Sequence, residues 1–303
     1  DVSDFNPPET MKVAQVSDLN VSQIEIPLPE VRGNVGVSLG GGMLEFAEVD
    51  MPDIETLFGS NKFTGNELEG YLYDLKQDED GDPMRVDYLE TVREFVEKGW
   101  KDRTLDDFFR SPEPLYASHF FIPLQGAESA PKAYGMEDKM RPAQWLAHYR
   151  GRFAAPRTGT YRFVGSADDL LMVRVDGELV LDGGREGTIL TPYKTDREGD
   201  RQWRIGNTPL SVGEWMRLKE GEPLPIDVLV GERPGGAFGI WLFIQRKGEN
   251  YDVDDEGRPE LPVFALKPLS REDIERVEQE DYPADTGGPY FGARANAGAA
   301  DED

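Results

Sequence analysis

The strongest constraint on the fold is the run IWLFI at positions 240–244, in which every residue is apolar. A strand with one face in water alternates apolar and polar side chains, whereas a strand buried on both faces is apolar throughout. The run is far shorter than the roughly 20 apolar residues that a membrane-spanning helix needs. We therefore predict a strand enclosed between layers, as in a β-sandwich, and we expect no membrane span in this chain.

Further segments of the chain have the same character, being short, rich in β-branched and aromatic residues, and separated by turn residues. They are LEGYLYDLKQ from Leu68, SHFFIP near Phe120, QWLAHYRGRF from Gln144, TYRFVGS from Thr160, LLMVRV from Leu170, ELVLD from Glu178 and PIDVLVG from Pro225. Asp176 and Gly177 separate two of them and predict a tight hairpin whose turn needs positive φ. The pattern predicts a mainly β chain, folded as an antiparallel, jelly-roll-like β-sandwich.

Helical signals interrupt this β pattern at two places. Asp87 precedes a helical apolar face, and Glu90 follows it at the capping-box spacing. A second short helix is predicted from Thr104 to just before Pro112, so that residues 83–112 would form a small helical insertion. A C-terminal helix is predicted to start at Ser270.

These features divide the chain into three parts. Residues 1–68 contain early prolines and the run GNVGVSLGGG, which is typical of an extended N-terminal arm or linker. Residues 69–250 form the predicted β-sandwich. Residues 251–303 form a C-terminal segment with a short helix and an acidic tail that we expect to be disordered beyond about Ala295.

Composition removes several classes of function. The chain has 33 Lys and Arg against 59 Asp and Glu, a net charge of −26, and it has no cysteine. Disulfides, cysteine-ligated zinc and thiol catalysis are excluded, and so acidic a chain is a poor partner for nucleic acid. His119 and His148 both fall within apolar strand patterns, and we expect them to be structural.

No motif in the sequence points to catalysis, and the first residue of the chain bears on where in the cell the protein is found. Gly165 and Ser166 lack the spacing of a nucleophile elbow, and neither histidine lies in a recognisable triad, so we expect a protein that is not an enzyme.

The chain begins with Asp1 rather than Met. We therefore expect an extracytoplasmic protein, secreted, periplasmic or on the cell surface, whose signal or anchor is absent from this sequence.

The segment YRGRFAAPRTGTYRFVGSADDLLMVRVDGELVLDG, from Tyr149 to Gly183, is the most specific in the chain. It resembles the protective-antigen-fourteen (PA-fourteen) domain, a β-sandwich module of toxins, glycosidases and flocculin-type adhesins. LEGYLY from Leu68, GEW from Gly213 and the apolar run at 240–244 resemble the family's opening and closing strands. The resemblance covers about 69–250, and the helical insertion departs from the family's usual pattern.

The resemblance implies a binding site. In lectin members of the family, two adjacent aspartates joined by a cis peptide bind calcium, and the ion coordinates sugar hydroxyls; the matching residues here are Asp168 and Asp169. Calcium prefers several hard oxygen ligands, which adjacent carboxylates supply. The family often has Gly after the pair, where this chain has Leu170. Asn207 is the candidate for the asparagine that lectin members add, and Trp203 is the aromatic residue that we expect to stack on a sugar ring.

The same aspartates have a purely structural interpretation, in which they order a turn by accepting backbone N–H groups. Two functions therefore stay open. The first is a non-catalytic module of a secreted or surface-exposed bacterial protein that recognises a glycan or polysaccharide, with calcium as the candidate cofactor and with residues 183–224 shaping the site. The alternative is a structural or assembly module of a cell-envelope complex, which docks a partner protein through its arm.

Overall fold

A computed structural model describes residues 53–184, 203–205 and 208–293. The chain divides into two units, residues 1–53 and 54–303, and nearly all described residues belong to the second. The N-terminal arm up to residue 52, the tail from residue 294, most of the 185–207 segment and the candidate ligand Asn207 lie outside the described residues. None of the described helices is both long enough and apolar enough to cross a membrane.

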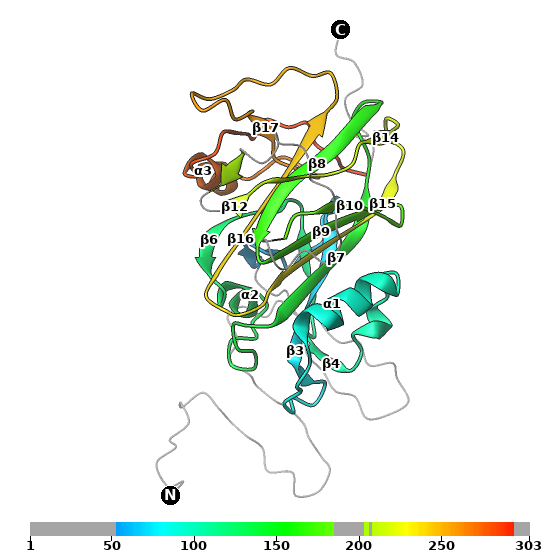
Figure 1. Ribbon diagram of the computed structural model, residues 1–303, viewed down its shortest axis with the longest axis vertical. Coiled ribbons are helices and arrows are strands. Elements are labelled where there is room, and N and C mark those ends of the chain that lie inside the picture. The colour runs from blue at the N-terminus through cyan, green and yellow to red at the C-terminus, as the bar shows by residue number, and fades with distance from the viewer. Residues whose placement is uncertain (1–52, 185–202, 206–207, 294–303) are drawn as a thin grey trace, which may run out of the picture. The chain divides into compact units, whose positions relative to one another are not determined.

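Two antiparallel sheets form the described unit (Figure 1). The larger sheet has nine described strands. Eight of them follow one another in a single order, and the ninth, β4 (Phe108–Arg110), pairs with β3 outside that order. The main path runs β1 (Glu55–Thr56), β2 (Gly59–Ser60), β5 (Leu115–Ala117), β3 (Leu68–Asp78), β7 (Trp145–Phe153), β15 (Leu224–Glu232), β9 (Leu170–Val175) and β10 (Glu178–Asp182).

The smaller sheet has five described strands, and β14 (Met216–Leu218) pairs with β8 beside its main path. That path runs β13 (Ser211–Val212), β8 (Gly159–Asp168), β16 (Ala237–Arg246) and β6 (Phe121–Gly126). Two short pairs complete the β structure, antiparallel β11 (Arg204–Ile205) with β12 (Thr208–Pro209), and parallel β17 (Leu261–Pro262) with β18 (Ala284–Asp285). The prediction of a mainly β, antiparallel sandwich is confirmed.

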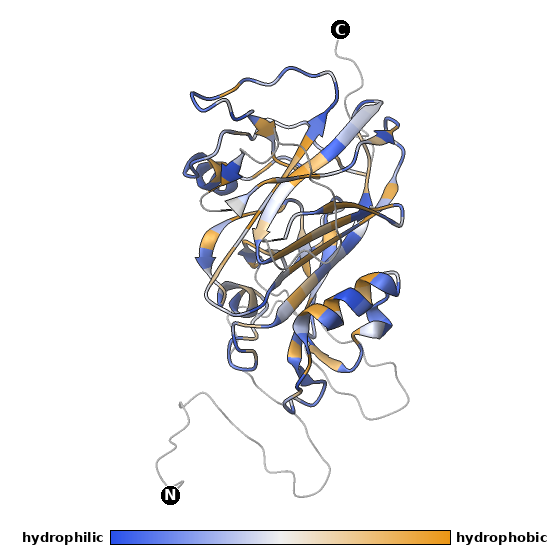
Figure 2. Ribbon diagram, in the orientation of Figure 1, coloured by the Kyte–Doolittle hydropathy of each residue, from blue (hydrophilic) through white to orange (hydrophobic). Residues whose placement is uncertain are grey.

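Three buried clusters explain why both sheets are apolar on both faces. The central cluster lies between the sheets and contains Phe163 of β8 and Leu242 of β16. A second cluster covers the outer face of the smaller sheet and contains Trp241 and Phe243. A third covers the outer face of the larger sheet and contains Phe95, which is fully buried. The apolar run in β16 therefore faces apolar layers on both sides, and apolar colour recurs along the strands in Figure 2.

Three α-helices are described, α1 (Tyr88–Glu97), α2 (Ser129–Ala133) and α3 (Arg271–Glu278), with a 3₁₀ turn at Asp102–Thr104. Asp87 caps α1 by accepting the backbone N–H of Glu90, as predicted. Ser270 caps α3, also as predicted, through a capping box with Asp273. The helix predicted from Thr104 is wrong. The 3₁₀ turn ends there, and the following segment is the edge strand β4, because pairing with β3 outweighs the local helical pattern.

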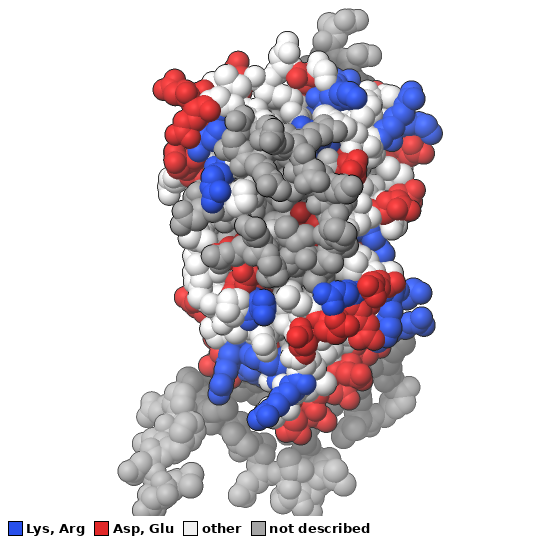
Figure 3. All heavy atoms as spheres, in the orientation of Figure 1, with Lys and Arg blue, Asp and Glu red and all other residues white. Residues whose placement is uncertain are grey.

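The compact unit is wider than the segment 69–250. Residues 54–67 contribute β1, β2 and the buried Phe58, whose ring lies 6.1 Å from that of Trp145. At the other end, Phe264 and Phe291 both lie in the central cluster. Acidic side chains gather on the face of the molecule where α1 lies (Figure 3).

Candidate functional site

The candidate site lies where the chain crosses between the two sheets. β8 belongs to the smaller sheet and β9 to the larger one, and Asp168 and Asp169 form the junction between them. The β15–β16 connection crosses back at the same end, since Gly239 of β16 pairs with Asp168. The peptide bond between the two aspartates is cis. The predicted pair thus lies at the edge of the sandwich, between two crossing connections.

Backbone hydrogen bonds hold Asp169 against the β15–β16 connection. Its N–H donates to the carbonyl oxygen of Gly231 at 3.3 Å, and its Oδ2 accepts the N–H of Arg233 at 3.1 Å. Asp169 is almost completely buried, whereas Asp168 is partly exposed. One hydrogen bond therefore fixes the backbone of Asp169 and the other orients its buried carboxylate, while Asp168 is partly exposed.

A third carboxyl group, Glu232, lies beside the pair. It is 1% exposed, and its Oε1 accepts the N–H of Gly235 at 2.8 Å. Its Oε2 is buried and finds no hydrogen-bond donor among the described residues. Burial, followed by the charge of Asp169, raises the pKa of Glu232 to about 8. The end of the sandwich thus brings three carboxyl groups together.

The helical insertion reaches this site through Tyr88, the first residue of α1. Its hydroxyl donates to the carbonyl oxygen of Trp145 at 3.2 Å and occupies the space that a Cβ on Gly231 would need, 2.2 Å away. Burial, together with the charges of Asp169 and Glu232, raises the pKa of Tyr88 well above its usual value. The insertion therefore contributes a phenol next to the carboxyl groups.

The start of the long excursion also lies at the site. After β10, the carbonyl oxygen of Gly183 accepts the N–H of Ala167 at 3.0 Å, immediately before Asp168. Asp182 is 1% exposed there. Residues 183 and 184, which follow β10, thus lie beside the aspartates, and residues 185–202 lie outside the described residues.

The other predicted site residues have different positions. Asn207 lies outside the described residues. Trp203 packs, half-buried, against the second cluster on the outer face of the smaller sheet. Its role in sugar stacking stays a prediction.

Sequence reasoning missed Glu232 and Tyr88. Glu232 ends an ordinary apolar strand, and Tyr88 lies on a helix with a conventional amphipathic pattern, so neither residue has a local signal. The strand pairing that places β15 next to β9 brings Glu232 to the pair. A pairing of that kind becomes visible only when the topology is known.

The donor chemistry of the site fits a hard cation such as calcium. Asp168 and Asp169 offer carboxylate oxygens, and the Oε2 of Glu232 is a buried oxygen without a donor. Within the described residues, however, no group of three or more acidic or histidine side chains is arranged to hold a metal ion. Since calcium takes about six to eight oxygens, the aspartates would supply only part of a coordination shell.

Comparison with known proteins finds a similarity in the region of the site. Residues 128–229, which include the junction of β8 and β9, match the family model of the PA14 domain. This stretch of the chain is similar to PA14 domains. A search of curated proteins found no match to the chain.

Several solved structures are similar to this chain. They include a PA14 sugar-binding domain from an RTX adhesin, 16% identical, covering 62% of this chain and 94% of that chain with a TM-score of 0.40. The PA14 domain of the MpAFP antifreeze protein is 15% identical and covers 63% and 88%, with a TM-score of 0.37. The Epithelial Adhesin 6 A domain from Candida glabrata, solved with Galb1-3GlcNAc, is 15% identical and covers 65% and 88%, with a TM-score of 0.33.

Proposed function

We propose that this chain is a non-catalytic module of a secreted or surface-exposed protein, and that it recognises carbohydrate through calcium held by Asp168 and Asp169. The observation that carries the proposal is the position of this pair. The PA14 match spans it, and it lies at the end of the sandwich with a partly exposed carboxylate beside a buried one.

The chemistry of that arrangement suits an ion that bridges protein and sugar. The buried Asp169 is oriented by backbone contacts, so its position does not depend on the ligand. Asp168 is partly exposed, which leaves an approach from solvent. An ion held by both carboxylates would keep coordination positions for neighbouring hydroxyl groups of a sugar, since calcium accepts many oxygens in flexible geometry.

A glycan array tests this function. The protein is applied in calcium and in chelator, alongside the variants Asp169→Asn and Asp176→Asn. Asp176 is a matched control, because it is an exposed aspartate at the far end of β9, in a turn with φ of 49° that asparagine also adopts.

We expect glycan binding in calcium that disappears in chelator and in Asp169→Asn, and that persists in Asp176→Asn. Binding by all three proteins regardless of calcium would leave carbohydrate recognition standing and reject the metal. No binding under any condition would reject the proposed function and favour the structural interpretation of the pair.

A further inference from the structure

A buried histidine joins the helical insertion to the larger sheet. His148 lies on β7, is 3% exposed, and faces the insertion on the outer face of that sheet. Its Nδ1 lies 3.1 Å from Oδ1 of Asp102, and its Nε2 lies 2.8 Å from Oδ1 of Asp227. The rings of Phe95 and Trp100 pack edge-on against the imidazole, with centroids 5.2 and 5.9 Å away.

The two contacts of His148 with carboxylates indicate the protonation state of its imidazole. An ionised carboxylate only accepts hydrogen bonds, and a neutral imidazole has one N–H group and one bare nitrogen. If His148 were neutral, its unprotonated ring nitrogen would direct a lone pair at a carboxylate oxygen, and that contact would be repulsive. Two good contacts therefore require the imidazolium form, in which both ring nitrogens donate.

Both carboxyl groups are held in the ionised form. The hydrogen bond from His148 lowers the pKa of Asp102. Burial opposes ionisation of Asp227, but its contacts with His148 and Arg174 outweigh burial and keep its pKa below the usual value. Neither aspartate therefore takes the proton that the imidazole needs.

Two arginines complete the charge balance. Arg150 pairs with Asp102, and Arg174 donates to Oδ2 of Asp227 at 2.8 and 3.0 Å. Arg174 also donates to the carbonyl oxygen of Gly99 at 2.8 Å and lies over the ring of Trp100. Other titratable groups near the network are Glu69, Tyr71 and Tyr73 of β3, with Tyr71 opposite His148 in the strand pairing, and Arg110 of β4, which lies over the Tyr71 ring.

The residues of this network come from two parts of the fold, the helical insertion and the larger sheet. Gly99, Trp100 and Asp102 belong to the insertion, whereas His148 and Asp227 belong to the sheet. We propose that protonated His148 is a pH-dependent clamp, which locks the outer end of the insertion, residues 99–105, onto the larger sheet and releases it when the imidazole loses its proton. This inference does not depend on the proposed carbohydrate function.

The sign of the effect follows from the contacts. Burial alone would lower the pKa of His148, but the hydrogen bonds to Asp102 and Asp227, and their charges, outweigh burial and raise it above 6.5. The clamp is therefore closed below pH 6.5 and opens as the pH rises through the elevated folded-state value.

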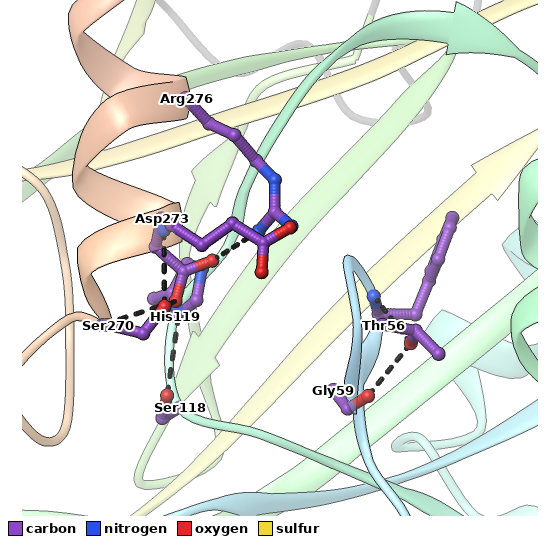
Figure 4. A network of polar contacts seen from close by, with 9 residues as sticks. Thr56, Gly59, Ser118, His119, Ser270, Asp273 and Arg276 are labelled. Carbon is purple, nitrogen blue, oxygen red and sulfur yellow. Dashed lines mark hydrogen bonds and ion pairs between the residues drawn. The ribbon is translucent and has the colours of Figure 1, made fainter. Parts of the chain in front are cut away.

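Nitrogen NMR of labelled histidine tests the protonation state directly. The chain has two histidines, so a His119→Gln variant leaves His148 alone. His119 is a suitable residue to replace, because it lies in a separate network with Ser118 and the α3 residue Asp273 (Figure 4). At pH 6.5 we expect the form of His148 with protons on both nitrogens to predominate. A neutral imidazole at that pH would overturn the proposal.

Hydrogen exchange tests the release. After correction for the intrinsic rate, protection of amides in residues 92–105 should fall as the pH rises through the titration of His148, approaching about tenfold per pH unit in the one-proton limit. Amides in β8 and β16 should keep their protection. In Asp102→Asn the side-chain amide can donate to a neutral Nδ1, so the fall should be lost.

Glu232, with a pKa of about 8, titrates in the same range and lies near Tyr88 at the start of α1. The exchange measurement is therefore repeated in Glu232→Gln, in which the fall should persist. A fall that disappears in Glu232→Gln, or that is unchanged in Asp102→Asn, would assign the effect to another group and overturn the clamp.

Discussion

Gly231 shows how one missing side chain shapes the candidate site. The hydroxyl of Tyr88 fills the space above this glycine, and Asp169 donates its N–H to the glycine carbonyl oxygen. The close approach of helix and strand is possible because Gly231 has no Cβ. The phenol, the backbone and the aspartate are therefore packed as one unit.

We expect Gly231→Ala to lower the free energy of unfolding by about 1–3 kcal/mol, because the new Cβ would lie 2.2 Å from the Tyr88 hydroxyl. Urea unfolding at equilibrium measures the change. Tyr88→Phe, which removes the hydroxyl and one buried hydrogen bond, should cost about 1 kcal/mol by the same measurement. An alanine at position 231 without any cost would show that the helix can move away from the strand.

Individual residues at this site differ in how far the sequence predicts them. Asp168 and Asp169 are adjacent in sequence, within a segment that resembles a known family, so they could be predicted. Glu232 lies 63 positions beyond Asp169 along the sequence, and it joins the pair only through the pairing of β15 with β9. Nothing in the local sequence around Glu232 encodes that pairing.

At the scale of elements, α1 links the outer layer of the larger sheet to the carboxyl groups. Its first residue, Tyr88, lies at the site, and its fully buried Phe95 packs against His148. The N-cap at Asp87 fixes the start of this helix. Order at the helix start therefore bears on the geometry of the site.

Asp87→Ala should destabilise the protein by about 1 kcal/mol, since the backbone N–H of Glu90 loses its acceptor. Asp106→Ala, at an exposed position in the same insertion, is the matched control and should change stability by less than about 0.5 kcal/mol. Thermal unfolding followed by circular dichroism compares the two. Equal effects would indicate that the cap contributes nothing.

The elements themselves are mostly encoded locally. The hairpin at Asp176 and Gly177 forms with positive φ at both residues, and the helices begin at the predicted caps Asp87 and Ser270. The failure at residues 104–112 has a tertiary cause. Phe108 pairs with Asp78 of β3, an interaction that the helical pattern around it does not reveal.

At the scale of the whole molecule, the buried charge network predicts how stability depends on pH. The raised pKa of His148 gives a contribution that is fully present below pH 6.5 and is lost as the pH rises through the folded-state value. The lowered pKa values of Asp102 and Asp227 give a contribution to stability that is present above pH 3.8. This contribution is lost as the pH falls through the folded-state pKa values of the two aspartates.

The midpoint urea concentration of unfolding should therefore fall in the wild type as the pH rises through the folded-state pKa of His148. It should fall less in His148→Gln, because glutamine has no proton to lose. His119→Gln is the control, because burial lowers the pKa of His119 and this residue makes no contact with the clamp. The account fails at this scale if His148→Gln and the wild type decline in parallel.

The net charge of −26 acts on the entire chain. Self-repulsion among acidic side chains opposes the compact state, and salt screens it over about 10 Å at 0.1 M ionic strength. We expect the unfolding temperature to rise with sodium chloride between about 0.01 and 0.3 M. A fall over that range would show that attractive ion pairs dominate instead.

Calcium titration by calorimetry, in a constant background of sodium chloride, is the most direct test of the central claim that Asp168 and Asp169 hold the ion. The account predicts saturable binding of one calcium per chain in the wild type and in Asp176→Asn, weaker binding of magnesium, and loss of the calcium signal in Asp169→Asn. Equal heats for calcium and magnesium in all three proteins would contradict it and leave the aspartates as residues that order a turn.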